Sequence, residues 1–486
     1  MMWSSLPAAP AITETHISVL FFVGDRAFKL KKPVELPFLD WRDRADRVAA
    51  CHREVELNRR LAPDVYLGVG ELAGPDDEWR EPLVMMRRMP DDRRLSQMIA
   101  DGHDVTSRLG ELAVLIAEFH RSARRPSTSG RGAHQEVIRN WSDNLDALRA
   151  ASAEGVLSAG DVDHVSGLAS RYLAGREPLF EARVAGGHVV DGHGDLLADD
   201  IFLLDDGPRV LDCLDFDDRL RTLDVLDDVA CLAMDLEQLG HPSPAELFLS
   251  RYLEAAGVAG PVSLTHHFIA YRAGVRSKIA ALRTQQGDRA ARDAARHLLD
   301  VAGRHLDAGR VRLVLVGGLP GTGKTTVASR LGDLTGWTVL HSDPVRKELA
   351  GVDAAAPMGA AYRQGLYQPA HTERTYAALL DRARAGLSLG ETVVIDASWV
   401  DPDRRRDAHQ IAEDTASDLI AVWCDAPAEV TERRIGERGD RGGSDATTEV
   451  ARSLARDAAP WPGARRLDTS GTLDESLSAL RLLVDA

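Results

Sequence analysis

Residues 313–326 read LVLVGGLPGTGKTT and decide the fold of the C-terminal part of the chain. The apolar, β-branched residues 313–316 predict a buried strand. The glycines that follow predict a tight turn, because glycine adopts backbone conformations that other residues rarely take. Residues 327–331, Val-Ala-Ser-Arg-Leu, then predict a helix. A strand, a glycine-rich turn and a helix in this order begin an α/β unit.

The same stretch has the spacing of a phosphate-binding loop. From Gly318 it runs glycine, four residues, Gly323, Lys324 and Thr325, which is the P-loop pattern. In this pattern backbone N–H groups and the start of the helix face an anion. Lys324 is expected to reach the β- and γ-phosphates, and Thr325 to hold Mg²⁺. The predicted nucleotide-binding residues here are Gly318, Pro320, Gly321, Thr322, Gly323, Lys324, Thr325 and Thr326.

Composition limits the class of protein. A chain of 486 residues predicts two to four domains, so the P-loop unit is only part of it. With 44% hydrophobic and 28% charged residues the chain is typical of a soluble globular protein. No run approaches the ~18 apolar residues of a membrane span, and residues 1–10 lack the features of a signal peptide. We therefore expect a cytoplasmic protein without a membrane partner.

Cysteine usage and charge exclude further classes. Cys51, Cys213, Cys231 and Cys424 form no C-x-x-C pair, which argues against a zinc ribbon or a disulfide framework. A net charge of −16 disfavours sequence-independent binding to nucleic acid.

The N-terminal region predicts a β-hairpin. Residues 17–23 and 27–31 have β-like patterns and are separated by the turn Gly-Asp-Arg at 24–26. Lys29 and Lys31 are two residues apart, so they lie on one face of the second strand, and either could reach a phosphate. The alternative is an ordinary solvated strand face.

The pattern then changes from strands to helices. A helix is predicted over residues 42–61, where Glu54 could orient one of the lysines. Two strands follow over 66–72 and 82–89. Helical periodicity dominates from residue 95, over 95–100, 109–120, 141–151, 164–173, 228–241, 245–256, 264–283 and 288–306. The order predicts a β-rich lobe followed by a helical lobe.

Residues 189–204 and 210–218 together hold eight aspartates. A short loop is expected to present Asp195, with Asp200 five residues later, and a hairpin to bring Asp215 back beside them. Clustered carboxylates repel one another, so a bound cation is the simplest explanation for an apolar-flanked group of this kind. The alternative is a set of acidic surface turns.

His193-Gly194-Asp195, Asp200 and Leu214-Asp215-Phe216 resemble the signature of the aminoglycoside phosphotransferase family, which has the protein-kinase-like fold. The resemblance covers roughly residues 12–300. It implies that Asp195 accepts or orients the proton of a substrate hydroxyl, that Asp200 and Asp215 bind Mg²⁺, and that His193 braces the loop. It also implies that Lys29 or Lys31, Glu54 and an apolar hinge near Met86 form the nucleotide lobe.

Two points of this resemblance concern the metal ligands. The family usually has asparagine where this chain has Asp200, which adds negative charge beside the transferring phosphate. Asp212 and Asp215 compete for the second metal position. The spacing to Asp224 and to residues 227–230 favours Asp215.

The C-terminal region predicts a parallel sheet with strands at 313–317, 338–341, 392–397 and 418–424. Ligands of such sheets bind at the carboxyl ends of the strands, which brings Asp343, Arg346 and Asp396 to the cleft. Ser-Asp-x-x-Arg at 342–346 resembles the polynucleotide and small-molecule kinase group, which implies that Asp343 engages the acceptor hydroxyl and Arg346 a substrate oxygen. Asp396 is a candidate for the substrate or for Mg²⁺. The helix end at 432–446 resembles the lid of these kinases, with Arg434 and Arg438 as the phosphate-closing residues; a charged surface helix is the alternative.

The sequence therefore predicts two fused units. Residues 1–307 are expected to form an α+β protein-kinase-like domain, with a β-rich lobe at about 12–90 and a helical lobe at about 91–305, and residues 308–486 an α/β P-loop kinase domain. The predicted function is ATP- and Mg²⁺-dependent phosphoryl transfer to hydroxyls of small molecules, with Asp195, Asp343 and Lys324 as catalytic residues. The alternatives are a regulatory protein with a pseudokinase domain and a nucleic-acid end kinase. The acceptors and the oligomeric state stay open.

The basic stretch of Arg272, Arg276, Lys278 and Arg283 predicts a solvated or carboxylate-pairing face rather than a nucleic-acid site.

Overall fold

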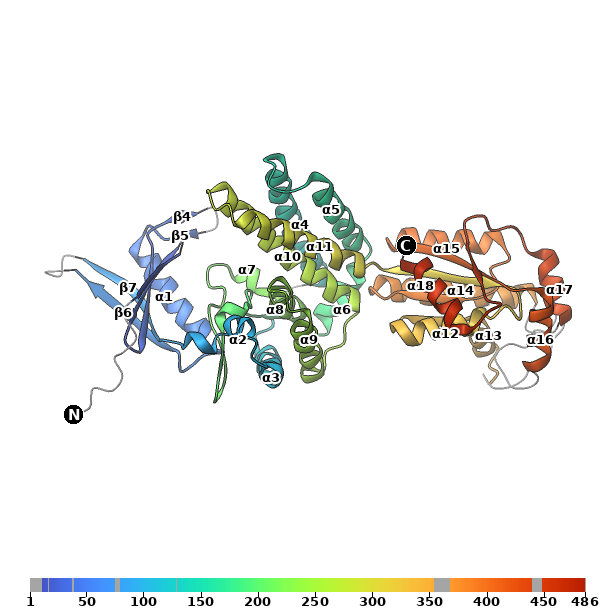
Figure 1. Ribbon diagram of the computed structural model, residues 1–486, viewed down its shortest axis with the longest axis horizontal. Coiled ribbons are helices and arrows are strands. Elements are labelled where there is room, and N and C mark those ends of the chain that lie inside the picture. Colours follow the sequence, from blue (N-terminus) through green and yellow to red (C-terminus); the bar gives the residue numbers. More distant parts are fainter. Residues whose placement is uncertain are drawn as a thin grey trace.

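The computed structural model describes residues 11–15, 17–36, 39–74, 79–127, 129–353, 368–438 and 448–485. The molecule is elongated (Figure 1). An antiparallel sheet lies at one end, a bundle of helices in the middle, and a sheet covered by helices at the other end.

The N-terminal sheet is five-stranded and antiparallel, in the order β1-β2-β3-β7-β6. The predicted hairpin is confirmed as β2 and β3, which turn at Gly24 with a positive φ of 58°. Helix α1 begins after Asp43, whose side chain caps it, and packs Cys51 and Val55 against the sheet. The elements are β1 (Ala11–Glu14), β2 (Ser18–Val23), β3 (Arg26–Lys31), β4 (Glu35–Leu36), β5 (Leu39–Asp40), α1 (Arg44–Asn58), β6 (Tyr66–Ala73) and β7 (Arg80–Arg87).

A helical lobe follows, and the helices predicted there are confirmed, mostly with longer bounds. The helices of this lobe are α2 (Leu95–Ala100), α3 (Thr106–Ser122), α4 (Gly130–Ala153), α5 (Ala159–Ala174), α6 (Glu177–Ala185), α7 (Asp218–Arg221), α8 (Val225–Gln238), α9 (Pro242–Ala256), α10 (Val262–Gln285) and α11 (Ala291–Ala308). The sequence did not predict α6 and α7. The hairpin predicted between Asp200 and Asp215 is formed by β9 (Ile201–Leu204) and β10 (Gly207–Val210), whereas the antiparallel pair of β8 (Val189–Asp191) with β11 (Thr222–Asp224) was not predicted. These pairs frame the aspartate-rich loops.

The C-terminal sheet is parallel throughout, in the order β13-β14-β12-β15-β16. Alternate residues of β12 face opposite sides, with Leu313 and Leu315 in one core and Val314 and Val316 in another. Helices α12 and α18 share the core of Val314 and Val316, and α14 and α15 share the other. The elements are β12 (Arg312–Gly318), α12 (Lys324–Thr335), β13 (Thr338–His341), α13 (Ser342–Leu349), α14 (Pro369–Ser388), β14 (Val393–Asp396), α15 (Pro402–Asp414), β15 (Asp418–Asp425), α16 (Ala428–Arg438), α17 (Thr448–Asp457), β16 (Arg465–Asp468) and α18 (Leu473–Asp485).

The fold class predicted from the sequence is therefore confirmed. A β-rich lobe with one helix and a helical lobe form the protein-kinase-like arrangement. The parallel sheet whose central strand leads into the glycine-rich turn and α12 forms the P-loop kinase arrangement.

The two halves are joined through buried contacts. The amino end of β15 lies against the helical lobe, since Arg171 and Arg310 form ion pairs with Asp418 at 3.1 and 2.6 Å. The fully buried Arg176 donates from Nη1 to the carbonyl of Thr415 at 2.8 Å. Helix α11 extends to Ala308, and β12 begins at Arg312, so the connection between them is short. One hydrophobic core runs from the helical lobe to α14 and α15.

Replacement of Arg176 by methionine is expected to lower the free energy of unfolding by about 1–3 kcal/mol, because the Thr415 carbonyl loses a buried donor. Denaturation by urea, followed by circular dichroism, measures this difference. Arg171→Met is the matched control, since Arg171 is half-exposed and its ion pair is expected to contribute at most about 1 kcal/mol. Equal losses in the two variants would contradict a special role of the buried side chain.

In the part of the chain that the structure describes, no helix combines the length and the apolar character needed to cross a bilayer.

Candidate active sites

The loop that carries Asp195 is held by a buried carboxylate of α8. Asp228 accepts hydrogen bonds from the backbone N–H groups of His193 and Gly194 at 2.7 and 2.9 Å. His120 lies 3.0 Å from the same carboxylate. Burial alone would raise the pKa of Asp228, but the hydrogen bonds and the charge of His120 hold it well below its ordinary value. The loop is therefore anchored on an ionised group, and Nε2 of His193 lies 3.1 Å from the carbonyl of Leu211.

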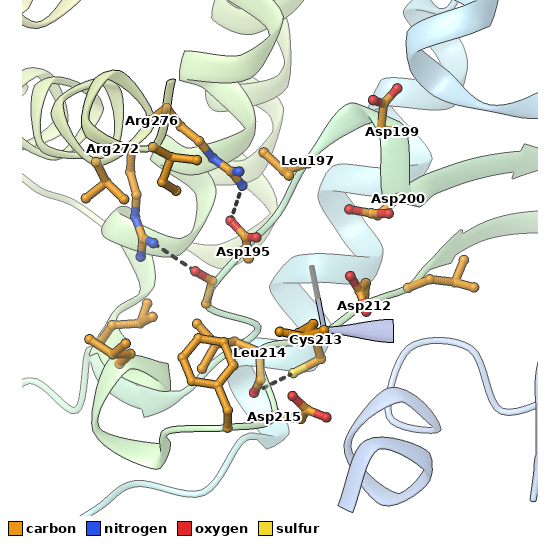
Figure 2. A pocket seen from close by; sticks show the side chains of 18 of the residues that line it. Asp195, Leu197, Asp199, Asp200, Asp212, Cys213, Leu214, Asp215, Arg272 and Arg276 are labelled. Atoms are coloured by element: carbon orange, nitrogen blue, oxygen red, sulfur yellow. Dashed lines mark hydrogen bonds and ion pairs between the residues drawn. The ribbon is translucent and has the colours of Figure 1, made fainter. Parts of the chain in front are cut away.

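Three carboxylates converge above this loop (Figure 2). Asp195 forms an ion pair with Arg276, while Asp200 and Asp212 lie near each other. Burial and repulsion from Asp212 and Asp195 raise the pKa of Asp200 well above its ordinary value. Its carboxylate has no hydrogen bond or ion pair among the described residues. Asp199, the next residue, points away from the group and accepts a hydrogen bond from Ser96.

The two lysines of β3 share one glutamate. Nζ of Lys29 lies 3.0 Å from Glu54 and 2.7 Å from Asp212, and Nζ of Lys31 lies 2.8 Å from both Glu54 and Asp215. Glu54 therefore holds both lysines, where the sequence predicted one. The side chain of Lys31 is 2% exposed and that of Lys29 15%.

The surroundings of Asp212 and Asp215, the two candidate metal ligands, shift their pKa values in opposite directions. Lys29 lowers the pKa of Asp212, whereas burial raises the pKa of Asp215 in spite of Lys31. The side chain of Asp212 is 55% exposed and that of Asp215 12%. Asp212 also has a positive φ of 59°, which is strained for a residue other than glycine. The hydroxyl of Tyr66 accepts a hydrogen bond from the backbone N–H of Asp212 at 3.2 Å.

These groups line one cavity of about 1430 Å³ that runs from the β-rich lobe into the helical lobe. Met86 of β7 lines it, as the sequence predicts for an apolar hinge. The side chains that face it include Lys29, Lys31, Asp195, Asp200, Asp212 and Asp215.

One contact of this site, between Arg276 and Asp195, was not predicted from the sequence. The basic stretch of α10 was expected to be solvated or to pair with carboxylates, and its three arginines pair: Arg272 binds Asp227 at 2.7 Å, Arg276 binds Asp195, and Arg283 binds Asp288 at 2.6 Å. That one of these carboxylates is Asp195 was not predicted. The four-residue spacing of Arg272 and Arg276, which puts both on one helix face, is the signal that could have pointed to it.

The P-loop adopts the geometry that its glycines predict. Gly321 and Gly323 have positive φ values of 85° and 84°. A Cβ atom at Gly318 would lie 2.7 Å from Oγ1 of Thr322 and 2.8 Å from the carbonyl of Cys424, so only glycine fits there. Lys324 begins α12, whose first turn also carries Thr325 and Thr326. Pro320 is buried in the same loop.

Asp396 ends β14, the strand next to β12, and pairs in register with Val316. Its Oδ2 lies 2.9 Å from Nδ1 of His341, and its Oδ1 is buried without a hydrogen-bond partner in the described part of the chain. Asp343 and Arg346 follow on α13 and form an ion pair with each other. The predicted acceptor residues therefore lie on β14, the strand next to the P-loop strand, and on helix α13.

The predicted lid is described in part. Nη2 of Arg434 donates to the carbonyl of Thr469 at 2.8 Å, and Thr469 in turn donates to the carbonyl of Thr322 at 2.6 Å. Helix α16 packs on the loop, since a Cβ at Gly321 would lie 2.7 Å from the carbonyl of Thr431. The side chain of Arg438 and residues 439–446 lie outside the described residues.

No group of three or more His, Cys, Asp or Glu side chains within the described ranges has the arrangement of a protein-only metal site. The residues nevertheless fit Mg²⁺, which usually takes one or two carboxylates together with phosphate oxygens. The unpaired Asp200 and the orphaned Oδ1 of Asp396 are suitable carboxylates in the two halves.

A family model and solved structures match parts of this chain. Residues 313–460 match the family model described as AAA domain. A complex of APH(2")-IIia with GDP and kanamycin is matched over 62% of this chain and 95% of that chain, with 15% identity and a TM-score of 0.39. The APS kinase CysC of Mycobacterium tuberculosis, in complex with AMPPNP and APS, is matched over 36% of this chain and 99% of that chain, with 22% identity and a TM-score of 0.28.

A relative shares both halves. "Uncharacterized protein Rv2004c" of Mycobacterium tuberculosis is 42% identical over 468 residues, which cover 96% of this chain and 93% of that protein. The chain therefore belongs to the family of Rv2004c.

Proposed function

We propose that the protein is a bifunctional, ATP- and Mg²⁺-dependent phosphotransferase, in which residues 1–307 and residues 308–486 each transfer a γ-phosphoryl group to a hydroxyl of a small molecule. The observation that carries this proposal is that each half combines a lysine suited to phosphates with a carboxylate oxygen that has no hydrogen-bond partner in the described residues: Lys29 with the half-buried Asp200, and Lys324 with Oδ1 of the buried Asp396. Phosphoryl transfer needs positioning and charge neutralisation more than a protein nucleophile.

In the N-terminal half, Lys29 is the lysine suited to the nucleotide phosphates, because it is the more exposed of the two and pairs with the cavity-facing Asp212. Lys31 forms ion pairs with Glu54 and Asp215, and its Nζ lies 4.2 Å from the ring centre of Trp41. Asp195 accepts or orients the proton of the acceptor hydroxyl. Mg²⁺, held by carboxylates here, would neutralise charge that develops on the phosphate oxygens.

In the C-terminal half, the backbone of Gly318–Gly323 and the start of α12 bind the phosphates, together with Lys324. Thr325 and Asp396 are the candidates to hold Mg²⁺. Asp343 is the proposed general base. Arg346 is its ion-pair partner and is proposed to bind oxygens of the substrate. Arg434 steadies the loop at Thr469 that lies against the P-loop.

The test is ADP formation by the full-length chain with Mg²⁺ and ATP against sugars, amino sugars, aminoglycosides, nucleosides and oligonucleotides, with products identified by mass spectrometry. A phosphorylated small molecule supports the proposal. Absence of any acceptor-dependent ADP, together with absence of nucleotide binding, would refute it.

A second candidate is a regulatory protein whose N-terminal half binds nucleotide without turning it over. Asp200 in place of asparagine favours it, as does the ion pair that engages Asp195. Calorimetry with ATP distinguishes the two: nucleotide binding in a Lys324→Ala background that needs no Mg²⁺ and leads to no turnover indicates the regulatory protein.

The metal ligands of the N-terminal half give a prediction of their own. The spacing in the sequence favoured Asp215, but the exposure of Asp212 and its closeness to Asp200 support Asp212. In a Lys324→Ala background, Asp212→Asn is expected to raise the Mg²⁺ concentration for half-maximal turnover by at least about tenfold, because an ionised ligand is lost. Magnesium titration of the initial rate measures this.

Asp215→Asn is the matched comparison. It is expected to change the Mg²⁺ requirement less than about threefold and to lower the free energy of unfolding by about 1–3 kcal/mol, because the buried Lys31 loses one of two carboxylates. The reverse ranking of the two variants in the titration would restore Asp215 as the ligand.

A further inference from the structure

The side of the cavity away from the nucleotide lobe is formed largely by α10 and α4. Helix α10 contributes Tyr271, Arg272, Val275, Arg276 and Lys278 to the lining. Some charged side chains on this side are fully paired with neighbouring groups of opposite charge, and others are not. This difference bears on the acceptor.

Two of the arginines are fully used by the fold. Arg272 donates to Asp227 at 2.7 Å and to the carbonyl of Gly194 at 2.8 Å, and its side chain is 10% exposed (Figure 2). Arg183 donates twice to Asp224, each time at 2.7 Å. Their charges are neutralised and their role is to hold the loop and the helices together.

Arg276 is different. Among the described residues, its ion-pair partner is Asp195, the carboxylate proposed to handle the acceptor proton. The side chain of Arg276 is 24% exposed and lines the cavity. Arg276 donates to Oδ1 of Asp195, and Sγ of Cys231 lies 3.8 Å from the same oxygen. A guanidinium has five N–H donors in a planar fork, so Arg276 keeps donors for a second oxyanion that enters the cavity.

Lys278 adds a cation without a matching carboxylate. It is half-buried and lines the cavity, and no carboxylate of the described residues lies within 4 Å of its ammonium group. Burial lowers the pKa of Lys278, and Asp143 is the acidic neighbour that opposes this effect. A partly desolvated ammonium group gains from a nearby anion.

The carboxylates on this side are already engaged. Glu136 of α4 is bound by Arg139, and Asp218 by Arg53 and Arg221. Asp224 and Asp227 are bound by Arg183 and Arg272. Within the described part of this wall, cations are left over and carboxylates are not. The unpaired carboxylate that a polycationic acceptor could meet in this cavity is Asp200, which belongs to the proposed Mg²⁺ ligands and not to these paired carboxylates.

We propose that the hydroxyl acceptor of the N-terminal site carries an anionic group, a phosphate or a carboxylate, and that Arg276 and Lys278 bind it. This inference rests on the proposed phosphotransferase function. Arg276 would bridge the acceptor's anion and Asp195, which brings the acceptor hydroxyl beside the carboxylate that takes its proton.

The test uses the full-length chain with Lys324→Ala, which silences the P-loop half. A hexose, its 6-phosphate, the matching hexuronate, an amino sugar and kanamycin are compared as acceptors. The kcat/KM of one of the two anionic acceptors is expected to exceed that of the hexose by at least about tenfold, and kanamycin to be the poorest. The better of the two anions tells phosphate from carboxylate. Equal or better use of the neutral or cationic acceptors would overturn the inference.

Variants separate the role in binding the anion from the role in holding Asp195. Arg276→Gln is expected to lower kcat/KM for the anionic acceptor by about 10- to 100-fold, and for the hexose by less than about threefold; Lys278→Gln should follow the same pattern more weakly. Arg283→Gln is the control on the same helix, since Arg283 is exposed and bound to Asp288. A loss by Arg276→Gln that is equal for all acceptors would show that Arg276 acts only on Asp195 and would overturn the inference.

Calorimetry decides the case in which no acceptor is turned over. With AMPPNP and Mg²⁺ present, the hexose 6-phosphate and the hexuronate are titrated into the Lys324→Ala chain and into the same chain with Arg276→Gln. Tighter binding of an anionic probe than of the hexose, lost with Arg276→Gln, supports the anion site even if the phosphotransferase proposal fails. Binding that is equal for charged and uncharged probes, or absent for both anions, overturns it.

Discussion

Replacement of Lys324 by alanine is expected to lower turnover at the C-terminal site by at least about 100-fold, the effect of removing one preorganised cation or donor from a developing charge. Lys324 is the first residue of α12 and directly follows Gly323, whose left-handed backbone turns the chain toward the phosphates. Acceptor-dependent ADP formation in an Asp195→Asn background measures the C-terminal site alone.

The control for Lys324→Ala lies on the same helix. Arg330 is exposed and its ion pair with Asp333 lies on the surface, so Arg330→Ala is expected to leave turnover within about twofold. Full C-terminal activity of the Lys324→Ala protein would contradict the assignment of the P-loop as the phosphate site.

Replacement of Asp195 by asparagine is expected to lower kcat of the N-terminal site by about 10²- to 10⁴-fold, the usual contribution of a general base. Asparagine keeps the shape of the side chain and can still accept from Arg276, so ATP binding should change little. The rate is measured in the Lys324→Ala background, and ATP affinity by calorimetry.

Asp205→Asn is the comparison for Asp195→Asn. Asp205 is an exposed aspartate in the turn between β9 and β10, where it pairs with Arg93, and its replacement should leave kcat unchanged. A kcat of the Asp195→Asn protein near that of the unmodified site would remove Asp195 from the mechanism. A parallel loss of ATP affinity would point instead to a collapse of the loop.

Local patterns in the sequence predict the elements well where the pattern is strong. Strand β13 and helix α2 have the predicted bounds, and the alternation of β12 matches its two cores. Strands β1 and β16 were missed. Each has four residues and gains its place from pairing with a neighbouring strand, and short strands of this kind carry little periodicity.

The site was predictable as a list of residues and less so as a set of contacts. Motif spacing brought out Asp195, Asp200 and Lys324, because their chemistry depends on local loops. The choice between Asp212 and Asp215 depends on a single backbone conformation and on which lysine each aspartate meets, and both are settled by long-range packing. The pairing of Arg276 with Asp195 joins residues 81 positions apart, which no local pattern encodes.

All strands of the parallel sheet point the same way, and this direction decides on which side of the C-terminal half the P-loop lies. The amino end of β15 lies against the helical lobe, while its carboxyl end, like that of β12, leads to the P-loop and α16 at the far end of the molecule (Figure 1). The carboxyl end of the sheet, which leads to the P-loop, therefore faces away from the N-terminal half. Under the proposed bifunctional activity, a product released by one half would diffuse through bulk solvent to reach the other. An added enzyme that consumes this product should then intercept it fully, as expected for two linked catalysts without a tunnel between them.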